Sequence, residues 1–210
     1  IMKNFDTVII GGGIGGLMAA YRLKENAPEM SVAIVERGSE LEKRSCPAGR
    51  GKGCVRCKLC SITSGFAGAG AFSDGKFNLG TAYGGTLGEE LGDDVAMRYI
   101  DEVDKILTLY CTGSQPDVYR SSEALKLKCL QNNLRLLDMN VKHLGTDRNF
   151  TTMQGIIARL REQNVQLLSL HDCLSVSNAP GGGYALAFQN GEEMHARHVI
   201  IATGRGGAGF

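Results

Sequence analysis

A glycine loop between a strand and a helix constrains this chain more than any other feature. Residues 5–10 end in an apolar, β-branched run typical of a buried parallel strand, and residues 17–24 are typical of a helix. Between them lies Gly11-Gly12-Gly13-Ile14-Gly15-Gly16. The first glycine of such a loop permits a tight turn, the second lets backbone approach a pyrophosphate, and the third lets helix and strand pack closely. The loop therefore predicts a diphosphate site at the start of the helix.

An acidic residue ends the next predicted strand. Residues 31–36 form a second apolar run, and Glu36 follows Gly16 by 20 residues. In a dinucleotide-binding unit, an acid at this place accepts hydrogen bonds from ribose hydroxyls and disfavours a 2′-phosphate. The structural alternative is an ordinary glycine turn followed by a surface glutamate. The order strand, loop, helix, strand favours the dinucleotide site.

In the rest of the chain, the spacing of the apolar residues changes twice. Apolar residues recur at helical spacing in three segments, 95–110, 122–137 and 151–163. The second of these helices has a predicted apolar stripe of Leu125, Leu130, Leu134 and Leu137, and the third one of Met153, Ile156, Ile157 and Leu160. Four strands are then expected, at 165–170, 173–176, 184–189 and 198–202. Residues 37–81 are rich in glycine and cysteine and indicate long ordered loops.

The last strand helps to identify the dinucleotide. Val199-Ile200-Ile201-Ala202-Thr203-Gly204 follows a predicted meander and resembles the second signature of flavoproteins with two dinucleotide-binding domains. In a domain that binds only NAD, strands and helices would keep alternating. The resemblance implies FAD and an α/β fold: a Rossmann-like parallel sheet with a β meander and a mostly helical insertion. We expect an FAD-binding βαβ unit with glycine- and cysteine-rich loops at 1–80, the insertion at 81–150, and the return to the FAD-binding domain at 151–210.

A further stretch narrows the resemblance. Residues 64–76, together with 143–147 and the preceding cysteines, resemble a family of FAD-dependent dehydrogenases described largely by prediction. The resemblance covers essentially the whole chain, and its most specific part is the run from Gly68 to Lys76. Ala67 departs from the family pattern, which has glycine there, and its methyl group would crowd the flavin side of the loop.

The resemblance implies a set of cofactor contacts. The pyrophosphate and the adenosine ribose are expected at Gly11, Gly13, Ile14, Gly15, Gly16 and Glu36, with Arg37 against the adenine. Gly70, Ser73, Asp74 and Gly75 are expected along the pyrophosphate and ribityl chain. Backbone near Leu174 is expected at the adenine edge, and Ala202, Thr203 and Gly204 over the dinucleotide. A simple core position is the alternative for Leu174.

Four cysteines bunch within a basic segment. Cys46, Cys54, Cys57 and Cys60 are interleaved with Arg44, Arg50, Lys52, Arg56 and Lys58. Four thiolates could hold zinc or an iron–sulfur cluster, and nearby cations would favour the thiolate form. The spacing, however, matches neither a zinc ribbon nor the bacterial ferredoxin run. Metal binding, redox-active thiols and structural cysteines therefore all remain open.

The histidines are less informative. His143, at a predicted strand end, is a candidate for facing substrate, with a structural role as the alternative, and Asp147 is expected to lie at a helix start. His171, His195 and His198 are expected at the surface of the meander. Arg205-Gly206-Gly207 is a second loop expected to approach the cofactor. The sequence assigns no catalytic residue.

Charge and composition argue against nucleic acid and anionic membranes as partners, and the cysteines favour a cytoplasmic location. The formal net charge is +1 and the pI about 7.7, so nothing indicates nucleic acid or an anionic membrane. No apolar run is long enough for a membrane span. Clustered cysteines without an export signal indicate reduced thiols in the cytoplasm.

The predicted function is that of an FAD-dependent oxidoreductase, a dehydrogenase. The flavin would accept a hydride or electrons from a small-molecule substrate or donor, with NAD(P)H as one candidate. We also expect a C-terminal half beyond residue 210, because such flavoproteins complete the site with a later Gly-Asp segment. The alternatives are a non-catalytic nucleotide- or metal-binding module that uses the cysteine cluster, and a folding fragment that binds nothing.

Overall fold

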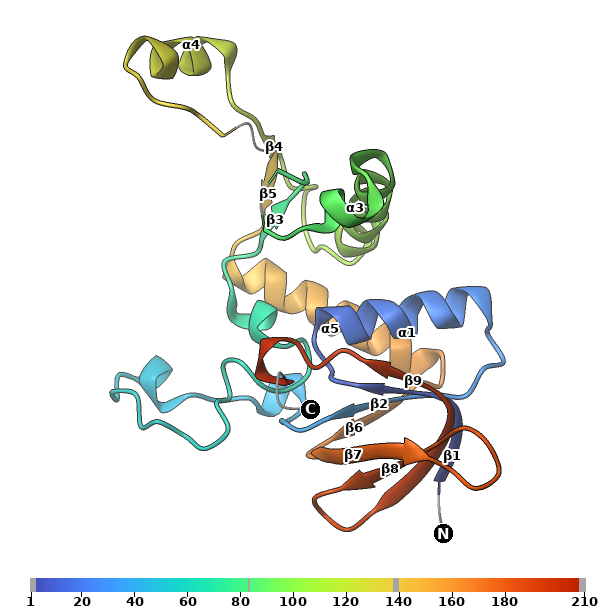
Figure 1. Cartoon of the computed structure of the whole chain (residues 1–210). Helices are drawn as coiled ribbons and strands as arrows, with labels where there is room; N and C mark the ends of the chain where they lie inside the picture. Colours follow the sequence, from blue (N-terminus) through green and yellow to red (C-terminus); the bar gives the residue numbers. More distant parts are fainter. Residues whose placement is uncertain (1–2, 83, 138–139, 208–210) are drawn as a thin grey trace. The chain divides into compact units, whose positions relative to one another are not determined.

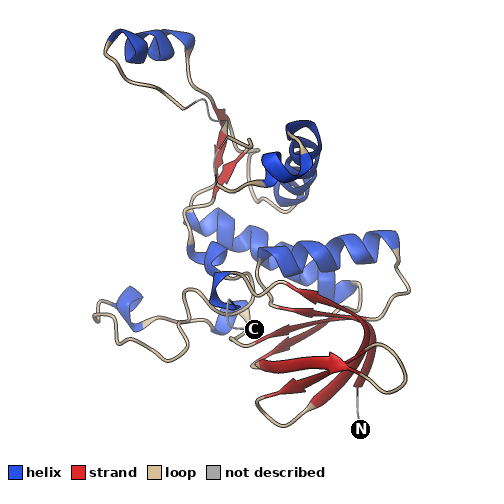
Figure 2. Cartoon of the chain, viewed as in Figure 1, coloured by secondary structure: helices blue, strands red, loops and turns tan. Residues whose placement is uncertain are grey.

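The structure, a computed structural model, describes residues 3–82, 84–137 and 140–207 (Figure 1). The chain forms two compact units. The first comprises residues 1–72 and 154–210, and the second comprises residues 73–153. Figure 2 shows that both units contain helices and strands.

A six-stranded sheet forms the first unit, in the order β6-β2-β1-β9-β8-β7. Its strands are β1 (Lys3–Ile10), β2 (Val32–Glu36), β6 (Gln166–Ser169), β7 (Cys173–Asn178), β8 (Tyr184–Phe188) and β9 (Glu193–Ile201). Strands β6, β2, β1 and β9 run parallel, whereas β9, β8 and β7 are antiparallel neighbours. The predicted Rossmann-like parallel sheet with a β meander is confirmed.

The two faces of β1 and β2 pack against different elements. Helix α1 (Ile14–Asn26) contacts both strands, and Ile9 points toward it, since a Cβ at Gly16 would lie 3.3 Å from the Ile9 side chain. On the other face, Val8, Ile10, Ala33 and Val35 form one buried cluster with Cys173, Leu186, Phe188, Met194 and Ala196 of the meander. Cys173, the first residue of β7, belongs to this cluster, so the carboxyl ends of β1 and β2 lie beside the start of β7.

Helix α5 (Thr146–Glu162) begins in the second unit and ends in the first. Its predicted apolar stripe is confirmed, because Met153, Ile156, Ile157 and Leu160 are all buried. The helix begins five residues earlier than its predicted start at Thr151. Asp147 lies in its first turn, as expected, where its charge complements the helix dipole.

The second unit is built on a small sheet, of which the sequence indicated only a strand end at His143. Strands β3 (Lys76–Asn78), β5 (Val141–His143) and β4 (Val118–Tyr119) are antiparallel neighbours. Helices α2 (Leu87–Leu91), α3 (Asp93–Leu109) and α4 (Glu123–Gln131) complete the unit. Lys142 of β5 donates to Asp104 of α3 at 2.5 Å. Strands of two or three residues are too short to show a period.

The prediction for residues 122–137 was wrong in two respects. Helix α4 ends at Gln131, and Asn133 adopts a left-handed conformation (φ 56°) that ends helical geometry. The predicted stripe, Leu125, Leu130, Leu134 and Leu137, is 47–64% exposed. The helical spacing therefore predicted a helix that does form, but within the described part of the chain none of its residues is buried.

Candidate functional site

The glycines of the first loop are required for different physical reasons. Gly11 has φ 109°, and a Cβ there would lie 2.4 Å from the carbonyl oxygen of Ala202. A Cβ at Gly16 would lie 2.0 Å from the carbonyl oxygen of Gly11. At Gly13 and Gly15, in contrast, an added Cβ would meet no atom within 4 Å. Gly11 and Gly16 are needed for the fold, while Gly13 and Gly15 leave open space at the start of α1.

The start of α1 is not capped by the chain itself. Gly13 is its N-cap residue without a side-chain hydrogen bond, and the first turn contains no acidic residue. Backbone N–H groups at Ile14 and Gly15 therefore lie at the positive end of a 13-residue helix. Such an end binds a diphosphate through N–H donors and the helix dipole.

Glu36 is buried and holds three loops together. Its Oε2 accepts from the Gly12 N–H at 2.8 Å. Its Oε1 accepts from the N–H groups of Gly38 at 2.8 Å and Gly65 at 2.9 Å. An ionised carboxylate offers about four acceptor positions, so one remains on Oε2 for a ligand hydroxyl. The sequence predicted the ligand role and missed this structural one, which depends on residues up to 29 positions away.

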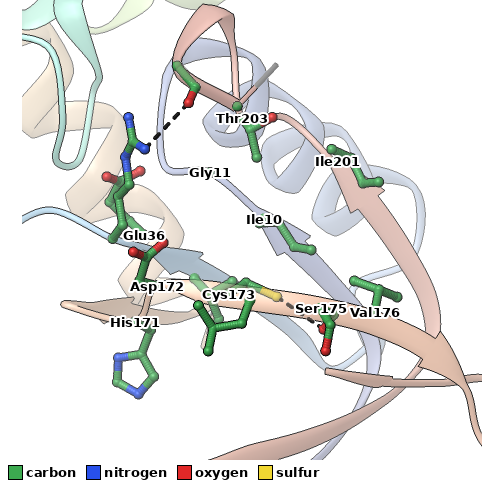
Figure 3. A pocket seen from close by; sticks show the side chains of 15 residues that line it. Ile10, Gly11, Glu36, His171, Asp172, Cys173, Ser175, Val176, Ile201 and Thr203 are labelled. Carbon is green, nitrogen blue, oxygen red and sulfur yellow. Dashed lines mark hydrogen bonds between the residues drawn. The ribbon is translucent and has the colours of Figure 1, made fainter. Parts of the chain in front are cut away.

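A cavity of about 640 Å³ lies at the carboxyl ends of β1, β2 and β9 and beside the start of β7 (Figure 3). In open α/β sheets, ligands bind at this edge. Of the predicted contact residues, Gly11, Glu36, Arg37, Leu174 and Thr203 line it. Sequence reasoning missed eight further lining residues, which are Ile10, Val35, His171, Asp172, Cys173, Ser175, Val176 and Ile201. Leu174 is 62% exposed, so the alternative of a core position for it is wrong.

The segment before β7 is fixed to the end of β2. His171 N–H donates to the Glu36 carbonyl oxygen at 2.9 Å, and Leu170 N–H to that of Gly38 at 2.9 Å. The His171 ring lies 2.8 Å from the Ser169 carbonyl oxygen, and its side chain is only 14% exposed. The expected surface position of His171 was therefore wrong, because its ring packs edge-on against the Phe188 ring, with the ring centres 5.7 Å apart. Burial raises the pKa of the neighbouring Cys173 thiol to about 11.

The loop after β9 folds closely over the cavity. Ala202 N–H donates to the Ile10 carbonyl oxygen at 2.8 Å, which continues the pairing of β9 with β1. A Cβ at Gly207 would lie 2.0 Å from the Thr203 hydroxyl, so the 3-10 turn Arg205–Gly207 packs directly on Thr203. Gly206 also lines the cavity, and its carbonyl oxygen lies 3.5 Å from the Arg37 guanidinium. Gly204 adopts φ 62° at the bend.

A buried arginine organises the loop between residues 60 and 72. The Arg44 guanidinium donates to four backbone carbonyl oxygens, those of Ser61, Ile62, Phe66 and Gly68. It also lies 4.7 Å from the centre of the Phe72 ring. Burial lowers the pKa of Arg44 to about 10, while the negative charge of Glu36 opposes that shift. The sequence placed Arg44 only among the cations near the cysteines, because its partners lie 17–24 residues away.

We expect Arg44→Lys to destabilise the fold by roughly 2–4 kcal/mol, because a single ammonium cannot serve four carbonyl oxygens. The free energy of unfolding in urea measures this effect. Lys43→Met is the matched control, since that neighbouring side chain is 70% exposed. The organising role of Arg44 is contradicted if both variants unfold at the wild-type urea concentration.

The remaining predicted contacts lie elsewhere in the chain. Gly70 belongs to the 3-10 turn Ala69–Phe72 of the first unit. Ser73, Asp74 and Gly75 belong to the second unit, where Gly145 N–H donates to the Asp74 carbonyl oxygen at 3.0 Å. Gly75 has φ 65°, and a Cβ there would lie 2.9 Å from the side chain of Asn149. None of these four lines the cavity of the first unit.

His143 lies beside Asp74 within the second unit. Its Nε2 is 4.0 Å from the Asp74 carboxylate, which also forms an ion pair with Lys76 at 2.7 Å. The hydrogen bond from Lys76 holds the pKa of Asp74 below its usual value. All three side chains are about half exposed. The structure thus brings together a charged cluster at β3 and β5 and leaves the role of His143 in substrate binding a prediction.

Within the described residues, the cysteine segment contains no preformed metal site. Cys54, Cys57 and Cys60 are exposed, and Cys46 is partly buried. Among the described residues, no three histidine, cysteine or acidic side chains are grouped closely enough to hold a metal ion. The side chain of Arg50, one of the interleaved cations, lies outside the described residues.

Comparison with known protein families gives a match over nearly the whole chain. The sequence profile of the pyridine nucleotide-disulphide oxidoreductase family matches residues 5–208. A 42-residue stretch, 18% of this chain and 8% of its relative, is 52% identical to the electron transfer flavoprotein-ubiquinone oxidoreductase of Pseudomonas aeruginosa.

Solved structures share the fold at low identity. Glycine oxidase from Geobacillus kaustophilus matches 97% of this chain and 56% of its own, with a TM-score of 0.55 and 14% identity. A 3-ketosteroid-Δ4-(5α)-dehydrogenase from Rhodococcus jostii matches 95% of this chain and 45% of its own, with a TM-score of 0.58 and 14% identity. The chain thus spans about half the length of these structures.

Among the described residues, no helix has the length and apolar character needed to cross a membrane.

Proposed function

Because this chain belongs to the pyridine nucleotide-disulphide oxidoreductase family, we propose that it binds FAD and works as part of a flavin-dependent dehydrogenase. One observation carries the proposal. Glu36 keeps a free acceptor position at a cavity whose other side is formed by the glycine loop at Gly11. An adenosine diphosphate needs both features together, a ribose acceptor and nearby N–H donors.

The residues present fit such a ligand. The N–H groups at the uncapped start of α1 would hold the pyrophosphate, where Gly13 and Gly15 leave space. Oε2 of Glu36 would accept from an adenosine ribose hydroxyl. The exposed apolar side chains of Leu174 and Ile201 line the cavity and would contact the adenine. A 2′-phosphate would place a second negative charge beside the Glu36 carboxylate, which disfavours NADP in this site.

FAD, when bound, supplies the redox chemistry by accepting a hydride or an electron pair at its ring. The residues of the first unit bind and orient the adenosine diphosphate part of the cofactor. We propose a small-molecule substrate or electron donor, with NAD(P)H as one candidate. The seven cysteines are free thiols, which supports a cytoplasmic location as part of this proposal.

The cavity provides its own reporter for the experiment. Cys173 is buried and lines the cavity, so a ligand there should block its alkylation. We expect FAD or ADP, at about ten times its dissociation constant, to slow alkylation of Cys173 about tenfold. NADP at the same concentration should leave the rate unchanged. Peptide-level mass spectrometry after alkylation at alkaline pH measures each site separately.

Cys111 of the second unit is the internal control, because it does not line this cavity. Its alkylation rate should be the same with and without ligand. If FAD left Cys173 as reactive as before, or if NADP protected it equally well, the proposed ligand and its orientation would both be wrong.

A further inference from the structure

A loop of the first unit, residues 51–60, is positively charged and is called here the basic arm. All of its residues are exposed, and Figure 1 shows it as a loop that extends away from the six-stranded sheet. Its cations are Lys52, Arg56 and Lys58, and no acidic residue lies between positions 43 and 73. The arm is therefore a strongly cationic surface on a chain whose net charge is only +1.

Aliphatic side chains alternate with these cations. Val55, which precedes Arg56, is 60% exposed, and Leu59, which follows Lys58, is 38% exposed. Sites that bind single-stranded nucleic acid add aromatic rings on which the bases stack, and residues 51–60 contain none. A protein surface that combines carboxylates with exposed apolar side chains would complement both the charge and the apolar character of the arm.

The second unit carries such a surface, called here the acidic patch. Its members are the exposed side chains of Glu89 and Glu90 in α2 and of Asp93 and Asp94 in the first turn of α3. The start of α3 lies against α2, since a Cβ at Gly88 would be 2.4 Å from the Asp93 carboxylate. No lysine, arginine or histidine lies between positions 77 and 97. Leu87 and Leu91 of α2 are 43% and 44% exposed, so the patch also combines charge with aliphatic side chains.

Neither surface is neutralised within the described part of the chain. The cations of the arm and the carboxylates of the patch take part in none of the ion pairs there. Glu90 and Asp93 instead accept hydrogen bonds from the hydroxyl groups of Thr86 at 2.7 Å and Thr81 at 2.6 Å. These bonds hold two carboxylates in place and leave their charge uncompensated, which reduces the entropy lost when a cationic partner binds.

We propose that the chain associates with a second copy of itself, and that the basic arm of one copy docks on the acidic patch of the other. The three cations of the arm meet the carboxylates of the patch, and aliphatic side chains of both surfaces pack between them. Opposite charges steer the two copies together and fix the pairing, while the apolar contact adds to its lifetime. The association requires no FAD, so its failure and the failure of FAD binding are separate results.

Sedimentation equilibrium of this chain measures the association, with a reductant present so that the exposed thiols form no cross-links. At low salt, the average mass should rise from monomer toward dimer between about 1 and 100 µM protein, because small polar interfaces are typically weak. Raising NaCl from about 20 to about 500 mM should weaken the association at least ~10-fold, because salt screens exposed charges.

Charge reversal of the arm tests the first surface. Lys52→Glu, Arg56→Glu and Lys58→Glu together make the arm acidic, and this variant should associate at least ~10-fold more weakly because like charges then meet. All three side chains are exposed, so the melting temperature should change by no more than a few degrees.

The matched reversal of the patch combines Glu89→Lys, Glu90→Lys and Asp94→Lys, and alone it should weaken the association to a similar extent. An equimolar mixture of the arm variant and the patch variant should restore the association. In the mixture, the acidic arm of one copy meets the basic patch of the other, and the unchanged arm and patch also match. Mixing restores only a contact between two copies.

A control variant separates this contact from an effect of net charge. Glu29→Lys, Asp117→Lys and Glu193→Lys replace three exposed acids outside the patch, so the control has the same net charge as the patch variant. It should associate far more tightly than the patch variant does.

Monomeric behaviour at every concentration would overturn the proposal, and a monomer whose arm binds polyglutamate or phosphatidylglycerol vesicles would assign the arm to another acidic protein or to a membrane. The proposal also fails if the wild type associates but the mixed variants do not, or if the control associates as weakly as the patch variant. Association that disappears on adding reductant would reflect disulfide cross-links in place of this contact.

Discussion

Gly16→Ala should prevent the first unit from folding, while Gly13→Ala should leave the fold intact and weaken dinucleotide binding at least ~10-fold. A Cβ at position 16 would lie 2.0 Å from the backbone carbonyl oxygen of Gly11, and neither atom belongs to a flexible side chain. Relief requires that α1 move away from β1, where Ile9 and Leu17 are fully buried. We expect a loss of at least ~4 kcal/mol, which approaches the whole stability of an ordinary domain.

Gly13 presents the opposite case. Its φ of −71° and ψ of −177° are accessible to alanine, and the added Cβ would meet no atom of the chain within 4 Å. The methyl group would instead occupy the space through which a pyrophosphate reaches the start of α1. We expect the melting temperature to change by no more than a few degrees, while FAD affinity falls at least ~10-fold.

Gly15→Ala is the matched control for stability. Its Cβ also meets nothing within 4 Å, and alanine is favoured over glycine in a helix by roughly 1 kcal/mol. Thermal unfolding and ligand titration of the three variants separate the two roles. The geometry is contradicted if Gly16→Ala melts like Gly15→Ala, or if Gly13→Ala binds FAD as tightly as wild type.

Glu36→Gln should weaken both the fold and the ligand site. The carboxylate accepts from three backbone N–H groups, and an amide would offer one acceptor oxygen and turn an NH₂ group toward donors. Leaving a buried donor unsatisfied costs about 1–3 kcal/mol, and more than one is affected here. We expect the free energy of unfolding to fall by roughly 2–4 kcal/mol.

The loss of ligand affinity should exceed what the loss of stability explains. Under conditions where the variant is folded, FAD affinity should fall at least ~10-fold, because the ribose loses its acceptor. Glu40→Gln is the control, since that side chain is 36% exposed and, among the described residues, forms an ion pair with Lys43 at 3.2 Å. A Glu36→Gln protein that unfolds and binds like Glu40→Gln would show that the carboxylate joins neither loops nor ligand.

The glycine loop and its flanking elements were predictable because their signals are local. Within residues 5–36, each element can be predicted from residues that are close in sequence. An apolar run predicts β1, the glycine spacing predicts the turn, and the apolar face of α1 predicts that the helix packs back on the sheet before β2. The meander was predictable for the same reason, since β7, β8 and β9 are separated by glycine-containing turns. The Gly11 and Gly16 geometry agrees with the roles expected from spacing alone.

What the sequence missed depends on contacts between distant residues. In the sequence, Arg44 is one cation among several. In the structure it fixes the loop between residues 60 and 72 by donating to backbone carbonyl oxygens, which every residue has and no sequence pattern reveals. His171 looks like a surface histidine until Phe188 of β8 packs against its ring. The stripe of Leu125 and Leu130 has helical spacing, but these two residues are 47% and 64% exposed. Periodicity indicates a face and does not say whether anything covers it.

The most direct test of FAD binding is a calorimetric titration of the folded chain with FAD, ADP and NADP. We predict one FAD bound per chain, competition by ADP at the same site, and a flavin absorbance at about 450 nm that stays with the protein on gel filtration. NADP should fail to compete, because its 2′-phosphate meets the Glu36 carboxylate. A folded chain that binds neither FAD nor ADP, or that prefers NADP to both, would contradict the proposal.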